Sequence, residues 1–188
     1  YFGRAWEFGY SFSVDETLRK WGRQEILADY VRMIRTIRPD VIVTMSPDGE
    51  QGGAHHQAQA RIAGEAFRLA ADPRSFPEQL KDGLRPWQPR KLYYSGGFGG
   101  RGGAPSPAAA ASQATVRVAT DVYDPLLGQT YAEIGSMARS QHKCQGMAQL
   151  LALPGGGGGA SYRLGDTSLS GGTSRTDQAL FDGIDTSL

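Results

Sequence analysis

The sequence of 188 residues is poor in several features that would assign a protein to a class at once. It has one cysteine, Cys144, so no disulfide can form within the chain and cysteine says nothing about the compartment. Its 20 basic and 19 acidic side chains leave a net charge of +1, without the basic surface of a nucleic-acid-binding protein. No apolar run approaches the roughly 20 residues that span a bilayer. We therefore expect neither a nucleic-acid partner nor a transmembrane segment in this chain.

The first residues contain neither an initiator methionine nor a signal peptide. The opening segment YFGRAWEFGYSF is instead rich in aromatic side chains that need a surface to pack against. This composition is typical of the middle of a domain. We expect the chain to be part of a longer protein, with any targeting segment upstream.

Glycine is abundant, with 26 residues concentrated at 96–103, 155–159 and 171–172. Glycine runs have high backbone entropy and no side chain to bury, so they predict loops or linkers. We therefore expect one domain over residues 1–154, followed by a glycine-rich linker and a C-terminal extension over 155–188.

Hydrophobic periodicity predicts a helix, a buried strand and a second helix in succession. Apolar residues recur at helical spacing over 24–38, and the opposite face carries Asp29, Arg32 and Arg35. The β-branched run 41–45 is typical of an interior parallel strand buried on both faces. A second amphipathic helix is expected over 56–71.

Three further elements complete the expected fold. Residues 91–95 and 115–120 are strand candidates, and a long helix is expected over 130–151. Helices alternating with buried strands predict an α/β protein with a Rossmann-like, open and largely parallel sheet flanked by helices. A nucleotide-binding role is disfavoured, because the glycine fingerprint of dinucleotide-binding domains is missing.

Two of the three histidines, His55 and His56, stand between the predicted strand and the second helix. Ligands bind in this crevice of open α/β sheets, and histidine is the commonest metal-binding side chain. Adjacent helical residues, however, point about 100° apart, and no HExxH or CxxC pattern supplies further ligands. The residues alone leave open a metal ligand, a catalytic base or the solvated start of a helix.

The segment IRPDVIVTMSPDGEQGGAHHQAQARIAGEAF resembles the second conserved block of the PIG-L/LmbE-like zinc de-N-acetylases. In that family a strand leads to a Gly-His-x-[Asp/His]-His segment that opens a helix. Three other segments are similar to the long, often exported members, and the four blocks occur in order over most of the chain: AWEFGYSFSVDETLRKWGRQEIL, YDPLLGQTYAEIGSMARSQHKCQG and LFDGIDTSL. Residues 1–154 thus resemble part of such a domain.

The resemblance implies roles for individual residues. His56 aligns with a zinc ligand, and His55 with a supporting position next to it. Gly53 stands where the family carries a histidine that stabilises the oxyanion or protonates the leaving amine. The family's N-terminal HPDDE-type block, which supplies two zinc ligands and the general base, is absent from these residues, and we expect it to lie upstream.

The implied activity is that of a Zn²⁺-dependent hydrolase. Metal-activated water would remove the acetyl group from an N-acetylglucosamine-type sugar, as a small-molecule or glycoconjugate amide substrate. The alternative is a non-catalytic α/β carbohydrate-binding or interaction module derived from the same fold, which the glycine at position 53 favours.

Other polar and aromatic residues have two interpretations each. His142 either lines the substrate pocket, as the recurrence of its block in the family implies, or lies on a helix surface. Asp48 either contacts sugar hydroxyls or is a solvated loop acid. Tryptophans can stack on sugars or pack in the core, and the chain has three: Trp6, Trp21 and Trp87.

Overall fold

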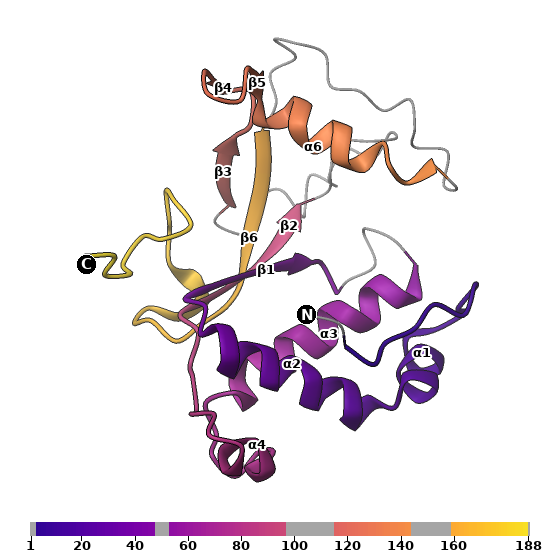
Figure 1. Ribbon diagram of the computed structural model, residues 1–188. Helices are drawn as coiled ribbons and strands as arrows, with labels where there is room; N and C mark the ends of the chain where they lie inside the picture. The colour runs from indigo at the N-terminus through magenta and orange to yellow at the C-terminus, as the bar shows by residue number, and fades with distance from the viewer. Residues whose placement is uncertain (1–2, 48–52, 97–114, 144–158, 188) are drawn as a thin grey trace.

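The computed structural model describes residues 3–47, 53–96, 115–143 and 159–187 (Figure 1). Its first half contains α1 (Val14–Trp21), α2 (Arg23–Ile37), β1 (Val41–Met45), α3 (Ala54–Leu69), α4 (Pro77–Lys81) and β2 (Lys91–Gly96). Its second half contains β3 (Thr115–Ala119), β4 (Tyr123–Asp124), β5 (Gln129–Thr130), α6 (Tyr131–Arg139), β6 (Gly159–Thr167) and the 3₁₀ turn η2 (Gly172–Ser174). The helices expected over 24–38 and 56–71 and the three expected strands are confirmed within a few residues. No helix among the described residues is long and apolar enough to cross a membrane.

The main sheet has the strand order β1-β2-β6-β3. β1 pairs with β2 in parallel, and β6 is antiparallel to both β2 and β3. β1, β2 and β3 consequently run in one direction and β6 in the other. The expected α/β class, with a Rossmann-like sheet flanked by helices, is confirmed.

β6 comes from the segment expected to be a C-terminal extension. It lies between β2 and β3 and pairs with both, for instance through Arg163 opposite Tyr94 on one side and Thr115 on the other. Residues 159–167 therefore belong to the same sheet as the first half of the chain.

The expectation that residues 41–45 form an interior strand is wrong for the described sheet, because β1 lies at its edge. Val43 is 46% exposed, and an apolar hollow of about 260 Å³ lies beside the strand. Successive side chains of a strand point to opposite faces. Ile42 packs against the helices, and Val41 packs against the cluster on the other face of the sheet. The apolar run 41–45 therefore reflects packing on both faces of β1 and does not require a neighbouring strand on each side of it.

The helical layer contains the larger core cluster. α1, α2 and α3 pack together below the sheet in Figure 1 and contribute buried side chains such as Ile26, Val31 and Ile62. Three alanines on α3 are fully buried, Ala58, Ala60 and Ala66. Such small side chains let α3 approach its neighbours closely. Arg38 caps the C-terminus of α2: it has a left-handed backbone (φ 55°) and donates its N–H to Ile34 O.

Arg35, expected on the solvent face of α2, is buried, with 2% of its surface exposed. Its guanidinium donates to the backbone carbonyls of the turn after α3 and to the side chain of Gln79: the acceptors are Ala70 O, Asp72 O, Ser75 O, Phe76 O and Gln79 Oε1. Burial lowers the pKa of Arg35 from its usual value. The polar face of α2 is therefore covered here by the turn that leads to α4.

The long helix expected over 130–151 is also wrong as a continuous element. α6 begins at the capping box of Thr130 and Glu133 and ends at Arg139, after which residues 140–141 form a turn. Residues from 144 to 158 lie outside the described part of the chain.

A buried ion pair fastens the C-terminal residues to the second face of the sheet. Lys91 Nζ and Tyr93 OH on β2 both donate to Asp177 Oδ2, each at 2.8 Å. Lys91 is 0% and Asp177 5% exposed. Burial raises the pKa of Asp177, but the hydrogen bonds from Lys91 and Tyr93 outweigh it and lower that pKa overall. Burial and the nearby Asp177 also raise the pKa of Tyr93.

We predict that Asp177→Ala destabilises the protein by about 3–5 kcal/mol, because it leaves the Lys91 ammonium buried without a negatively charged partner. The double change Lys91→Met with Asp177→Leu should recover most of this loss. The measurement is urea unfolding, with Asp185→Ala at an exposed carboxylate as the control. An Asp177→Ala variant as stable as the Asp185→Ala control would contradict the assignment.

The same pair predicts a pH dependence. Because the pKa of Asp177 is lower in the folded state, its stabilising contribution is present above the ordinary carboxyl pKa of about 3.9 and is lost as the pH falls through the folded value. The difference in unfolding free energy between the wild type and Asp177→Asn should therefore be constant near pH 7 and shrink below about pH 4. If the difference in unfolding free energy between the two proteins grows as the pH falls, the assigned direction of the Asp177 pKa shift is wrong.

Candidate functional site

The candidate site lies where the chain leaves β1 and enters α3, at the carboxyl end of a strand. Ser46, directly after β1, is 3% exposed. Thr44 on β1 donates its hydroxyl to Gln59 Oε1 on α3 at 2.9 Å, which ties the end of the strand to the helix. Asp48, one of the predicted substrate contacts, lies outside the described residues.

Gly53 precedes α3 in an extended conformation, with φ −86° and ψ −171°. Its carbonyl accepts the N–H groups of His56 and Gln57 at 3.0 and 3.3 Å. Any residue can adopt this backbone conformation, and a Cβ added at Gly53 would meet nothing within 4 Å. Neither the backbone nor the described surroundings require glycine here.

His55 is enclosed by aromatic rings. Its imidazole meets Phe8 edge to face at 4.4 Å between ring centroids and stacks on Trp21 at 5.5 Å, with 25° between the planes. Its Nε2 is buried and has no hydrogen-bond partner among the described residues. The indole N–H of Trp21 donates to Trp6 O at 2.8 Å, which holds the N-terminal segment over this helix end.

His56, the next residue, is exposed on the first turn of α3. The two imidazoles therefore differ in surroundings: one packs among aromatic rings and the other is open to solvent. This geometry leaves His56 accessible to a ligand. The supporting role of His55, the metal role of His56 and the catalytic role of position 53 stay predictions.

A metal site is not complete within the described residues, which contain no group of three His, Cys, Asp or Glu side chains able to hold an ion. His56 fits such a site as one accessible imidazole. Any further ligands would have to come from outside the described ranges.

His142 lies just beyond α6 and is exposed. Its Nδ1 is 3.1 Å from Arg139 O, a local contact at the end of the helix. No described contact joins His142 to His55 or His56, so its predicted place in a substrate pocket stays a prediction.

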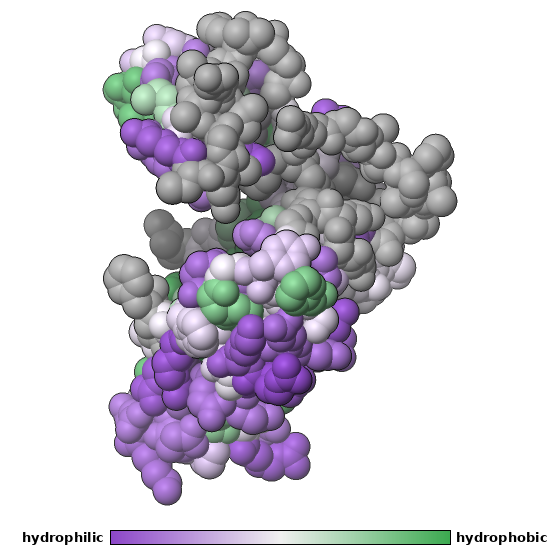
Figure 2. All heavy atoms as spheres, turned by 90° about the vertical axis from the view of Figure 1, so that its right-hand side faces the viewer, coloured by the Kyte–Doolittle hydropathy of each residue, from purple (hydrophilic) through white to green (hydrophobic). Residues whose placement is uncertain are grey.

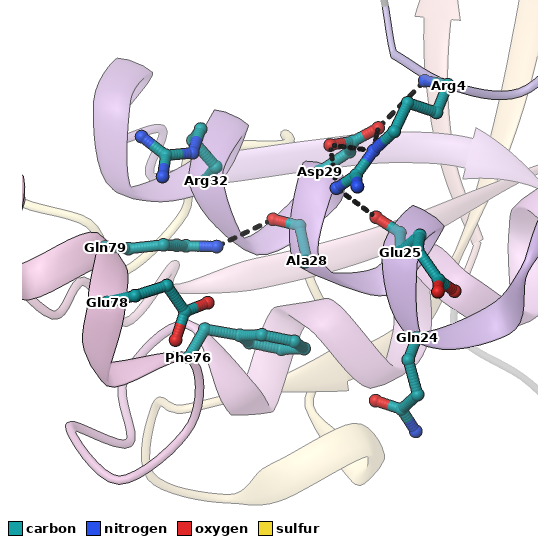
Figure 3. A pocket seen from close by; sticks show the side chains of 9 residues that line it. All are labelled: Arg4, Gln24, Glu25, Ala28, Asp29, Arg32, Phe76, Glu78 and Gln79. Carbon is teal, nitrogen blue, oxygen red and sulfur yellow. Dashed lines mark hydrogen bonds and ion pairs between the residues drawn. The ribbon is translucent and has the colours of Figure 1, made fainter.

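A hollow of about 380 Å³ lies away from the histidines, between the N-terminal segment, α2 and α4 (Figure 3). Three of its charged side chains, Arg4, Asp29 and Arg32, are used in structural contacts. Arg4 forms a forked ion pair with Asp29, Arg32 pairs with Asp82, and Gln79 donates to Ala28 O. We therefore assign the hollow a structural role and keep the start of α3 as the candidate site.

The sequence pattern predicts the histidines at the strand end but does not indicate Phe8 as a partner of His55. The available signal was the density of aromatic residues in the opening segment, four at alternate positions from 6 to 12: Trp6, Phe8, Tyr10 and Phe12. This density indicates that the aromatic side chains pack against other residues, but it does not identify those residues.

Part of the chain is similar in sequence to proteins whose names describe deacetylases. No family model matches the chain. A 71-residue stretch is 38% identical to a 1D-myo-inositol 2-acetamido-2-deoxy-alpha-D-glucopyranoside deacetylase of Thermobispora bispora, covering 38% of this chain and 22% of that protein. The protein of the same name from Streptomyces scabiei is 41% identical over 71 residues, covering 38% of this chain and 21% of that protein. That of Thermobifida fusca is 44% identical over 61 residues, covering 32% of this chain and 19% of that protein. The chain thus matches about a fifth of the length of these curated relatives.

Proposed function

We propose that this chain is part of a PIG-L/LmbE-like zinc de-N-acetylase that removes the acetyl group from an N-acetylglucosamine-type sugar. The observation that carries the proposal is the identity of 38–44% to three proteins whose names describe deacetylases of such a sugar. The position of His55 and His56 at a strand end in an α/β fold supports it.

His56 is the residue we assign to the metal. It is accessible, and it opens a helix of 16 residues whose position is fixed by a buried face. A zinc ion bound with two further ligands would lower the pKa of its water to about 7. In this proposal, the described residues contribute the imidazole of His56, which is held at the start of α3.

His55 serves as a support in this proposal. Phe8 and Trp21 fix its ring, and its position on α3 adjoins His56. Packing of this kind fixes the backbone of the first turn of α3, from which the side chain of His56 projects. His142 and Asp48 keep their proposed role of contacting the sugar.

The alternative is a non-catalytic carbohydrate-binding or interaction module. The glycine at position 53 favours it, because the side chain that would stabilise the oxyanion or protonate the leaving amine is missing there. A deacetylase would bind zinc and release acetate, whereas a binding module would do neither.

The two histidines are expected to differ when each is replaced in the full-length protein. His56→Ala should remove bound zinc and abolish acetate release from N-acetylglucosaminides. His55→Ala should weaken both by about tenfold to a hundredfold, as loss of a supporting residue does. Zinc is measured by atomic absorption, and Arg61→Ala at an exposed position of α3 is the control. Equal zinc retention in both histidine variants would refute the division of roles.

Gly53→His tests the missing side chain. Because a larger residue meets no described atom within 4 Å of its Cβ, the variant should fold normally. If the site is catalytic, the added imidazole should raise kcat for acetate release by roughly a hundredfold, the lower range for a positioned acid or base. Gly53→Ala is the matched control, since it adds the Cβ without the imidazole. A zinc-loaded Gly53→His protein with unchanged kcat would show that position 53 has no such role.

A further inference from the structure

The N-terminal segment 3–13 presents an exposed aromatic surface beside the candidate site. Trp6 is 53%, Tyr10 75% and Phe12 84% exposed. Their rings are not isolated, because Trp6 contacts Phe8 at 5.2 Å and Tyr10 contacts Phe12 at 4.9 Å, both edge to face. We call the exposed rings of Trp6, Tyr10 and Phe12 the aromatic platform.

The backbone that carries the platform is anchored to the helices. Arg4 is bound to Asp29 by its backbone N–H and its guanidinium. Further along, the carbonyl of Trp6 accepts the indole N–H of Trp21, and the N–H of Phe12 donates to Glu16 Oε2. The platform is therefore held in place before any ligand arrives, and ordering it costs little on binding.

Trp6, one of the three rings of the platform, is linked to the candidate site through Phe8. Phe8 touches Trp6 on one side and His55 on the other, and Lys20 Nζ lies 4.2 Å above its ring. Figure 2, which faces the side where α1 and the start of α3 lie, shows pale and green side chains above a strongly hydrophilic lower half. Exposed aromatic side chains bordered by polar ones are typical of a binding region.

We propose that the aromatic platform binds a pyranose or cyclitol ring of the substrate by stacking, next to the acetamido group processed at the start of α3. The inference rests on the proposed function and names the part of the substrate that these residues recognise. Tryptophan and tyrosine fit this ligand class, because each offers an apolar ring face together with a polar N–H or O–H group. A cyclic polyol has the matching character, with C–H groups on its faces and hydroxyls at its rim.

The kinetic test uses the full-length protein and two substrates. These are 1D-myo-inositol 2-acetamido-2-deoxy-α-D-glucopyranoside and the ring-free amide N-acetylethanolamine. Trp6→Ala and Tyr10→Ala should each raise KM for the glycoside about threefold to tenfold and leave KM for the ring-free amide unaltered. Phe181→Ala, at 52% exposure, is a control matched to Trp6 and should change nothing. An unchanged KM for the glycoside in both platform variants would overturn the proposal.

A binding test separates this proposal from the deacetylase function. In metal-free protein, the indole N–H resonance of Trp6, assigned by its loss in Trp6→Ala, should shift when the glycoside is added and not when N-acetylethanolamine is added. If no substrate releases acetate but the resonance shifts, the deacetylase function fails and the platform stands. If acetate is released but the resonance does not move, the platform fails alone. Protection of Trp6 from acrylamide quenching in the free full-length protein would also overturn the proposal, since another part of the protein would then cover the ring.

Discussion

The buried guanidinium of Arg35 is the interaction on which the placement of the candidate site depends. It binds four carbonyls between Ala70 and Phe76 and the side chain of Gln79, so the end of α3 cannot move away from α2. At its other end, α3 is tied to β1 by Gln59 and covered by Phe8 and Trp21. The helix that carries His55 and His56 is therefore held near both of its ends. The support of the site thus comes both from rings that touch His55 and from the Arg35 contacts at the far end of α3.

The elements around the site were predictable from the sequence because their signals are local. Periodicity over 24–38 and the β-branched run 41–45 each reflect the packing of one segment. Three features were not predictable in this way. The burial of Arg35 depends on a turn more than 30 residues away, the edge position of β1 depends on which strands pair with it, and β6 follows a glycine run that is typical of a linker.

The candidate site shows the same division. A strand followed by glycines and two histidines predicts a ligand site at a strand end, whatever the rest of the chain does. The sequence did not indicate that His55 would be enclosed and His56 exposed. That difference is made by Phe8 and Trp21, which are both far from the histidines in the sequence. Nor did it reveal that no described residue would meet a Cβ at position 53, which depends on three-dimensional surroundings alone.

The central position of β6 also determines the order in which the protein can fold during synthesis. β2 and β3 are translated before the strand that lies between them, and the chain from the end of β3 to the end of β6 is about fifty residues long. At about 5–20 residues per second, a ribosome needs roughly 2–10 s to make that stretch. For this interval the facing edges of β2 and β3 have no native partner and are open to chaperones or to neighbouring chains. Slow codons in this stretch would lengthen the exposure, so its translation rate bears directly on the yield of folded protein.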